Sequence, residues 1–460
     1  MLGQMKKIDI LPDDVLLEIF DFYMKTDSSY RDKMMTEAWQ SLIHVCRRWR
    51  CIVLGSPRRL NLQLYCTPET PARDTLDIWP ALPLIIEGPM VSSSGTDNVV
   101  AALGQSTRVC KVILWNLARW QLDEVLAAMQ VPFPELTELR LFLHDETPLV
   151  IPGLFLDGAA PRLQNFELDG VPLPGLPKLL LSAAHLVYLR LINIPHSGYI
   201  SPEAIVTNLS VLSNLEQLYL EFQSPQTWET RRPPPSKRSV IPALTSLHFK
   251  GVTEYLEDLV TGIETPQLEG IDITFFNQID FDTPRLARFI NRTPKLTKRD
   301  AHVRFIDRSV SIGLPPGFRT LMIAIPCREP DWQLSSIEQV CNSSLHPLSA
   351  VEDLYIEHRY SQLVWDDDAI DNTLWLQLFL PFTSVKNLYL SKKSSPGIAT
   401  ALHELDGGRI TEVLPSLQNI FVEEFEPSGP FQKNIGQFVA ARQLSDHPIT
   451  TSVWDKKTPT

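Results

Sequence analysis

The segment Pro134-Glu135-Leu136-Thr137-Glu138-Leu139-Arg140-Leu141 carries the pattern that decides the fold of this 460-residue chain. Leu136, Leu139 and Leu141 form the unit apolar-x-x-apolar-x-apolar, and a proline stands two residues ahead of it. The last two leucines are two residues apart, which is the period of a strand with one buried face. The segment therefore predicts a short strand entered through a proline, which ends any preceding helix.

The same unit recurs along most of the chain. Its copies begin at Val109, Leu136, Leu163, Leu186, Leu215, Leu244, Leu268, Leu296, Phe318, Val351, Val385 and Leu417. The copy at Leu296 is the weakest, since Arg299 and Ala301 stand in its later apolar positions. Proline precedes several copies by two residues. The surplus of proline, 37 residues against 20 glycines, is therefore explained largely by prolines at the boundaries of the repeats.

Stretches with helical spacing of apolar residues lie between these strands. They cover residues 122–129, 202–212, 255–263, 284–290, 332–340 and 374–380. One strand and one helix cannot bury an apolar face alone, but stacked copies can. We therefore expect an α/β fold over residues 65–430 with parallel strands on the concave side, an irregular solenoid of about twelve repeats that resembles a leucine-rich-repeat array. The alternative is an ordinary α/β domain with leucine-rich strands.

Residues 1–64 differ from the repeats and predict a separate helical block. The sequence Leu11-Pro12-Asp13-Asp14 suits the first turn of a helix, where proline loses no hydrogen bond and acids favour the helix dipole. Apolar residues follow at three- and four-residue spacing as far as Tyr23, which makes a broad apolar stripe. A surface loop is expected over residues 24–37 and a second helix over residues 38–50. At the other end of the chain, residues 431–460 are expected to form a helical cap and tail.

Two segments of the helical block resemble an F-box. They are residues 11–20, Leu-Pro-Asp-Asp-Val-Leu-Leu-Glu-Ile-Phe, and residues 45–50, Val-Cys-Arg-Arg-Trp-Arg. Residues 56–62, Ser-Pro-Arg-Arg-Leu-Asn-Leu, are similar to the strand entry that follows the F-box in many fungal F-box proteins. The resemblance implies docking on the Skp-family adaptor of an SCF (cullin–RING) ubiquitin ligase, and it departs from the family in the length of the expected loop.

Carried onto this sequence, the resemblance defines a candidate adaptor-binding face. Its residues are Leu11, Pro12, Leu16, Ile19, Val45, Cys46 and Trp49. The alternative is that these side chains pack among themselves and against the first repeat. Core packing explains Trp49 at least as well as docking does, whereas docking is favoured for Leu11 and Pro12 at the start of the block.

The residue between the last two apolar positions of each repeat is expected to lie on the exposed surface of its strand. In the last three repeats these residues are Tyr355, Tyr389 and Phe421. Exposed aromatic side chains on a rigid sheet are typical of binding hot spots, so these residues are the candidate target-binding site. The alternatives are that they stack on one another as a ladder or are covered by residues 431–444.

Composition and charge exclude several classes of protein. The net charge is −12, which disfavours a nucleic-acid binder because phosphate is repelled. The most apolar stretch, residues 176–194, contains Lys178, His185 and Arg190, so we expect soluble core there and no membrane partner. The N-terminal residues lack the apolar run of a secretory signal, and the 6 cysteines show no close pairing pattern. These features favour a cytoplasmic or nuclear location, or both.

The sequence contains no short motif that marks a catalytic or cofactor site, such as a P-loop, HExxH, GxSxG or CxxC. We expect no catalytic residue, no metal and no cofactor. The basic, proline-rich residues 231–238 are expected to form a solvated loop, with a nuclear-import signal as the alternative. Residues 365–368, Trp-Asp-Asp-Asp, with Asp371 are expected to form a solvated acidic turn, with a hard-cation site as the alternative.

Together these patterns predict a non-catalytic substrate receptor of a ubiquitin ligase. The helical block would bind the Skp-family adaptor and through it the cullin, and the solenoid would bind a target protein that the sequence does not identify. An interaction scaffold outside ubiquitination has the same fold and differs only in whether cullin is recruited. An enzyme in an irregular α/β domain is a third hypothesis, which requires a deep pocket lined by converging titratable groups.

Overall fold

The structure is a computed structural model. It describes residues 11–26, 33–144, 155–171, 176–225, 238–276, 281–296, 299–314, 321–343, 346–358, 371–405, 409–423 and 430–454. Its strands form a 16-stranded, mostly parallel sheet that alternates with helices. Contacts within the chain divide it into two compact units, Met1–Leu186 and Val187–Thr460.

Three helices begin the first unit: α1 (Asp13–Thr26), α2 (Lys33–Val45) and α3 (Arg47–Gly55). The prediction of one helix over residues 38–50 is wrong, because the helix is interrupted at Cys46 and two helices form instead. This residue is extended, with φ −160° and ψ 168°, and its sulfur accepts a hydrogen bond from the amide of Trp49 at 3.5 Å. Part of the loop expected over residues 24–37 is helical, since α1 ends at Thr26 and α2 begins at Lys33.

The helical block has its own apolar core, and one of its helices packs against the first strand of the sheet. Leu16, Phe20 and Met24 of α1 are buried, as is Trp39 of α2. The Trp39 indole N–H donates a hydrogen bond to the carbonyl of Gln63 at 3.2 Å, immediately before strand β1 begins. Helix α2 therefore packs over β1 and covers the start of the strand array.

The strands of the first unit pair in parallel and in chain order. They are β1 (Leu64–Cys66), β2 (Leu84–Pro89), β3 (Val109–Leu117), β4 (Glu138–Leu143) and β5 (Asn165–Asp169). The helices of this region are α4 (Ala72–Ile78), α5 (Ser93–Leu103), α6 (Arg119–Ala128) and α7 (Leu176–Ser182). The repeat pattern predicted β3 onwards, whereas β1 and β2 precede the first predicted copy.

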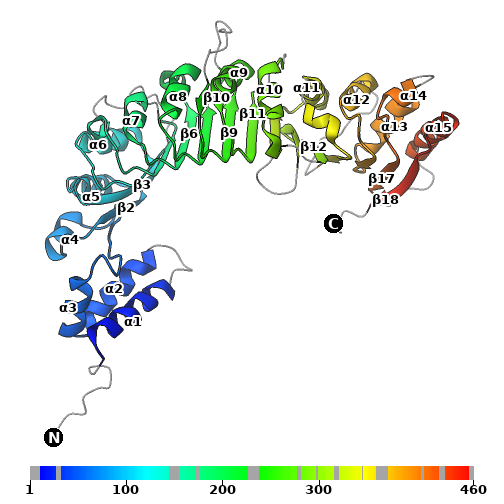
Figure 1. The fold of residues 1–460 in the computed structure, drawn as a ribbon. Helices are drawn as coiled ribbons and strands as arrows, with labels where there is room; N and C mark the ends of the chain where they lie inside the picture. Colours follow the sequence, from blue (N-terminus) through cyan, green and yellow to red (C-terminus); the bar gives the residue numbers. More distant parts are fainter. Residues whose placement is uncertain are drawn as a thin grey trace. The chain divides into compact units, whose positions relative to one another are not determined.

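The second unit continues the alternation of strands and helices. Its first strands are β6 (Tyr188–Ile194), β7 (Gln217–Phe222), β9 (Ser246–Gly251) and β11 (Gly270–Phe275), and β8 (Ser239–Val240) pairs separately with β10 (Ile263–Glu264). Its helices are α8 (Pro202–Leu209), α9 (Thr253–Gly262), α10 (Pro284–Asn291), α11 (Pro330–Asn342), α12 (Asn372–Phe379) and α13 (Ser395–His403). Within this unit the helices lie along one face of the strands (Figure 1). Each of the six stretches predicted to be helical from apolar spacing overlaps a helix, although the stretch 202–212 extends past the end of α8 at Leu209.

The strand order departs from chain order at one place in the second unit. Strands β12 (Asp300–Ile306), β13 (Ser309–Gly313) and β14 (Leu321–Pro326) form an antiparallel meander. The resulting order is β11-β14-β13-β12-β15, with β15 at Asp353–His358. Because β13 runs backwards between its neighbours, β12 and β14 both keep the direction of the array. The sheet is therefore mostly parallel, as expected, and the antiparallel strand β13 is an insertion that the repeat pattern did not predict.

The weak repeat that begins at Leu296 has a different register from the predicted one. Ala301 lies opposite Leu354 and Val303 opposite Ile356, and all of these side chains are buried. The later apolar positions of the repeat are thus Ala301 and Val303, and the assignment of Arg299 was wrong. A shift of two residues is compatible with the pattern because it leaves each side chain on the same face.

The C-terminal part of the second unit extends the parallel array. Strands β16 (Asn387–Leu390), β17 (Asn419–Glu423) and β18 (Thr450–Trp454) follow β15 in chain order, and α14 (Arg409–Glu412) and α15 (Pro430–Leu444) lie between them in the sequence. Strand β18 had no counterpart in the repeat pattern, because its residues are mostly small and polar.

The two faces of each strand differ in the way that the repeat pattern predicts. Repeat apolar residues such as Leu218, Leu354 and Leu388 are almost completely buried. The strand residues that alternate with them point away from this core and form what we call the open face. The chain is therefore an α/β protein of leucine-rich-repeat-like architecture with helices at its N-terminus. In the described part of the chain, no helix is long and apolar enough to span a membrane.

Candidate interaction surfaces

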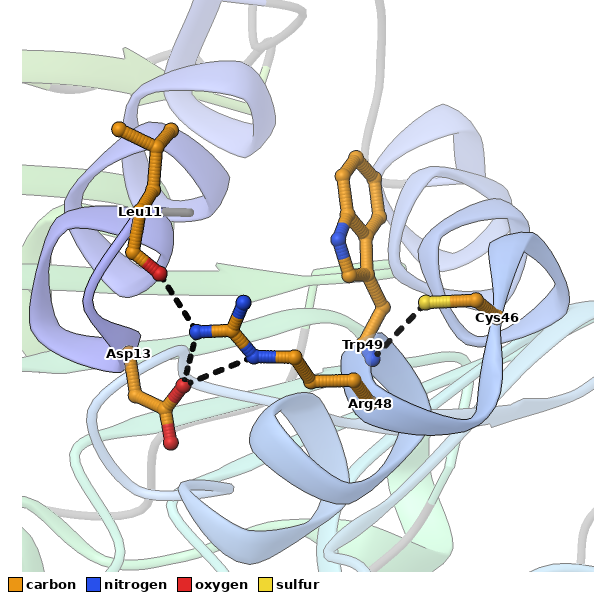
Figure 2. Close-up of polar contacts among 5 residues, drawn as sticks. All are labelled: Leu11, Asp13, Cys46, Arg48 and Trp49. Atoms are coloured by element: carbon orange, nitrogen blue, oxygen red, sulfur yellow. Dashed lines mark hydrogen bonds and ion pairs between the residues drawn. The ribbon is translucent and has the colours of Figure 1, made fainter. Parts of the chain in front are cut away.

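Arg48 brings the two F-box-like segments together. Its Nη2 donates hydrogen bonds to the carbonyl of Leu11 at 2.5 Å and to Oδ1 of Asp13 at 2.6 Å, and its Nε lies 3.1 Å from the same carboxylate oxygen (Figure 2). These acceptors belong to the entry of α1, whereas Arg48 lies in the first turn of α3. The planar guanidinium therefore fixes the start of α1 on α3.

A second arginine ties the segment after α3 to the same helix. Arg59 lies 2.5 Å from Glu18 and 3.8 Å from Asp14. Trp49 also packs on Phe20, with ring centroids 4.7 Å apart and an angle of 58° between the planes. The two F-box-like segments and the segment that follows α3 are thus held together by direct side-chain contacts.

The candidate adaptor-binding residues divide into three groups by exposure. Leu16 is 0% exposed, so its side chain supports the helical block from inside. Leu11, Cys46 and Trp49 are half-buried. The remaining candidates, Pro12, Ile19 and Val45, are exposed.

Helix α1 carries an exposed apolar row beside its buried one. Val15, Ile19 and Phe22 recur at i, i+4 and i+7, and all are exposed, Phe22 to 72%. Tyr23 lies next to them and Val45 ends α2, both also exposed. Phe22 was not among the predicted residues, although its spacing from Val15 and Ile19 is the signal that identifies it. Exposed apolar groups gathered on one helix are typical of a protein–protein contact.

The three candidate target-binding residues form part of a stacked ladder on the open face. Ring centroids of Tyr355 and Tyr389 lie 4.2 Å apart, and those of Tyr389 and Phe421 lie 4.6 Å apart. His302 stacks on the other face of Tyr355 at 4.2 Å. The stacking follows the strand register, which places these side chains directly opposite one another. The repeat pattern did not identify His302, because it placed the apolar positions of that strand two residues too early.

Trp454 of β18 also reaches this ladder. Its ring lies 5.5 Å from Tyr389 and 5.8 Å from Tyr355, tilted against both. Burial, with a smaller effect of the neighbouring Tyr389, raises the pKa of the Tyr355 hydroxyl. The ladder is therefore a rigid, half-buried row of rings with Trp454 beside it.

A polar ladder runs beside the rings, one open-face position earlier on each strand. Asn387 Nδ2 donates to Asp353 Oδ1 at 2.7 Å, Asn419 Nδ2 donates to Asn387 Oδ1 at 2.8 Å, and Thr450 Oγ1 donates to Asn419 Oδ1 at 2.6 Å. Every donor points toward Asp353, so the three hydrogen bonds form one chain that ends on its carboxylate. Burial, followed by repulsion from Asp353, raises the pKa of Asp300 on the neighbouring strand.

A charged cluster occupies the open face nearer the start of the second unit. His248 lies 3.2 Å from Glu221 through Nε2 and 3.2 Å from Asp272 through Nδ1. Its ring stacks on Tyr219, which Arg190 also contacts through its guanidinium. Burial opposes the charged ring, but the hydrogen bonds and charges of Asp272 and Glu221 prevail and raise the pKa of His248 to about 9. The imidazolium therefore carries its charge at neutral pH.

Two predicted loops lie almost wholly outside the described residues, namely 231–237 of the basic segment and 365–368 of the acidic one. Asp371 is described and is the N-cap of α12, where its Oδ1 accepts from the amide of Thr373 at 2.9 Å. The hydrogen bonds from Thr373 hold the pKa of Asp371 below its usual value. Among the described residues, no group of three or more His, Cys, Asp or Glu side chains is placed to hold a metal ion.

No model of a known protein family matches this sequence, and no curated protein matches it significantly. The class of protein therefore rests on the architecture, an α/β strand array of leucine-rich-repeat type preceded by a three-helix block.

Proposed function

We propose that this protein is the target-recognition subunit of an SCF (cullin–RING) ubiquitin ligase. The helical block docks on the Skp-family adaptor, which joins it to the cullin, and the open face of the strand array holds a target protein. The chain contributes no nucleophile to the reaction. It raises the effective concentration of target lysines near the conjugating enzyme by holding the target there.

The exposed row of α1 carries the proposal. Val15 and Ile19 lie one helical turn apart on the outside of a block whose inner row, Leu16 and Phe20, is already buried. A second apolar row on the same helix is not needed for the core of the block. An amphipathic surface of this kind fits an apolar groove or helix face of another protein, which is how an F-box-like module would meet its adaptor.

The rigidity of the block supports the same proposal. Arg48 fixes the entry of α1 on α3, and the Phe20–Trp49 contact fixes their packing from inside. An interface that is organised before binding loses less conformational entropy on association. The two F-box-like segments are thus joined by contacts that hold the outer row in one arrangement.

The aromatic ladder supports the target-binding half of the proposal. Tyr355, Tyr389 and Phe421 are held by mutual stacking, so a partner does not have to order them. Tyrosine at the centre of a contact surface is a frequent hot-spot residue, because its ring buries area while its hydroxyl forms hydrogen bonds.

Adaptor binding by the purified full-length chain tests the proposal. The probe is a purified Skp-family adaptor, titrated by calorimetry. We expect a defined complex with the unaltered chain and at least tenfold weaker binding after Ile19→Asp combined with Val45→Asp. Val211→Asp is the matched control, because Val211 is 39% exposed and Ile19 is 42% exposed. Absence of binding by the unaltered chain would refute the proposal.

Recruitment of cullin separates the ligase from a scaffold with the same fold. The adaptor complex is mixed with a purified cullin–RING assembly and analysed by size exclusion. A ternary complex supports the ligase. An adaptor complex that excludes cullin supports a scaffold and contradicts the role proposed here.

A further inference from the structure

We infer that the edge of β18 is a self-association surface, on which a second copy of this chain pairs through its own β18. The inference does not depend on the proposed function, because it concerns the opposite end of the chain from the helical block. Three observations carry it. The outer edge of β18 has no neighbouring strand among the described residues, Val453 beside that edge is exposed, and the first strand, β1, is by contrast covered by α2.

The outer edge of β18 presents backbone groups without a neighbouring strand among the described residues. Strand β18 is last in the sheet order and pairs only with β17 there. The amide of Thr450 bonds to the carbonyl of Gln418 on the β17 side at 2.9 Å. Because successive residues of a strand point their backbone groups to opposite sides, the N–H and C=O groups of Thr451 and Val453 point outward.

The core position next to this edge is also uncovered. Val453 lies opposite Val422 in the register, yet Val453 is 63% exposed and Val422 only 3%. The corresponding residues of the three preceding strands, Ile356, Leu390 and Val422, are buried, and each of them has the next strand beside it. At β18 such a strand is missing from the described part of the chain, so an added strand would bury both the backbone groups and the apolar side chain.

The strand at the other end of the sheet order, β1, is covered by a helix. Leu64 and Cys66 of β1 are buried, and α2 packs over the strand with Trp39 bonded to Gln63. Strand β18 also lacks the usual protection of an edge, since Thr450–Trp454 contains no charged residue and no proline. With one such edge on each copy, an antiparallel pair related by a two-fold axis closes both edges at once and cannot grow further.

The outward groups select a register for the pair. When Ser452 lies opposite Ser452 of the second copy, Thr451 exchanges both backbone hydrogen bonds with Val453 of that copy, and the reverse pair follows by symmetry. Ser452 itself then forms a pair without hydrogen bonds, with Cα atoms about 4.5 Å apart, a separation that a disulfide can span. The absence of charges in the strand means that no like charges meet across the axis.

The molar mass of the full-length chain, measured by light scattering after size exclusion from about 1 to 100 µM, tests the inference. We expect the mass to rise with concentration from 52.2 kDa toward twice that value. Val453→Pro removes only an outward N–H and keeps the bonds to β17, so it should remain monomeric with an unchanged circular dichroism spectrum. Val453→Thr keeps that N–H and should dimerise like the unaltered chain.

A cysteine pair tests the register separately. Under mild oxidation, Ser452→Cys should give a cross-linked dimer, whereas Thr450→Cys should stay at the background level set by the native cysteines, because its neighbour in this register is Trp454. A monomer at all concentrations overturns the inference. So does a dimer that survives Val453→Pro, that is lost on Ile19→Asp in α1, or that does not cross-link through position 452.

Discussion

Tyr355 and Tyr389 stack face to face on neighbouring parallel strands, with ring centroids 4.2 Å apart and 8° between the ring planes. Parallel strands place identical side chains one above the other at a fixed spacing, so successive repeats with an aromatic residue at one position must form such a row. The row of stacked rings offers a contact surface for a partner, and its stacking also stabilises the second unit.

The stabilising role of the ladder predicts a clear difference between two changes at Tyr389. Tyr389→Ala removes the stacking with Tyr355 and Phe421 and should lower the free energy of unfolding by about 2 kcal/mol. Tyr389→Phe keeps the ring and should change it by less than about 0.5 kcal/mol. Urea unfolding followed by near-ultraviolet circular dichroism measures both. Equal effects of the two changes would show that the ring stack contributes nothing to stability.

The charged cluster at His248 predicts a pH-dependent stability. The pKa of His248 is about 9 in the folded chain against 6.5 ordinarily, so the folded state holds the proton more tightly. The resulting stabilisation is complete below pH 6.5 and is lost as the pH rises to about 9. We expect the melting temperature to fall over this range, and to fall less after His248→Gln. An identical pH profile for the variant would contradict the assignment.

A buried carboxylate at the start of α10 predicts a large loss of stability when it is removed. Glu257 is buried and accepts hydrogen bonds from the amides of Arg285 at 2.9 Å and Leu286 at 2.6 Å. Glu257→Ala leaves these amides without the acceptor and should cost about 3 kcal/mol, and Glu257→Gln should cost about 1 kcal/mol. The exposed Glu269 provides a control, whose change to Ala should be nearly neutral in the same denaturant titration.

Two phenylalanines of α1 provide a matched test of the inner and outer rows. Phe20 is fully buried against Trp49, so Phe20→Ala should destabilise the helical block by about 3 to 5 kcal/mol. Phe22 is exposed, so Phe22→Ala should change the stability by less than about 1 kcal/mol. Thermal unfolding monitored by far-ultraviolet circular dichroism distinguishes them. A larger loss for Phe22 than for Phe20 would reverse the assignment of the rows.

The candidate sites were predictable to the extent that they follow local periodicity. The period of two in each strand placed Tyr355, Tyr389 and Phe421 on one face, and the register of the sheet brings them together. His302 was missed because two extra residues precede its strand, and a shift of two leaves no trace in an alternating pattern. Leu16 was placed on the candidate docking face although it is buried, because helical spacing alone does not distinguish the inner row of a wide stripe from its outer row.

The sequence by itself determined the strand and helix alternation and the apolar positions that form the core. These features are local, since each strand must expose one face and bury the other, and each repeat must cover its neighbour. The tertiary structure alone decided that β14 rather than β12 pairs with β11, that Arg48 joins α3 to the entry of α1, and that β18 adds a strand beside β17. These relations depend on which segments meet in space, and residues far apart in the chain carry no local signal of their contact.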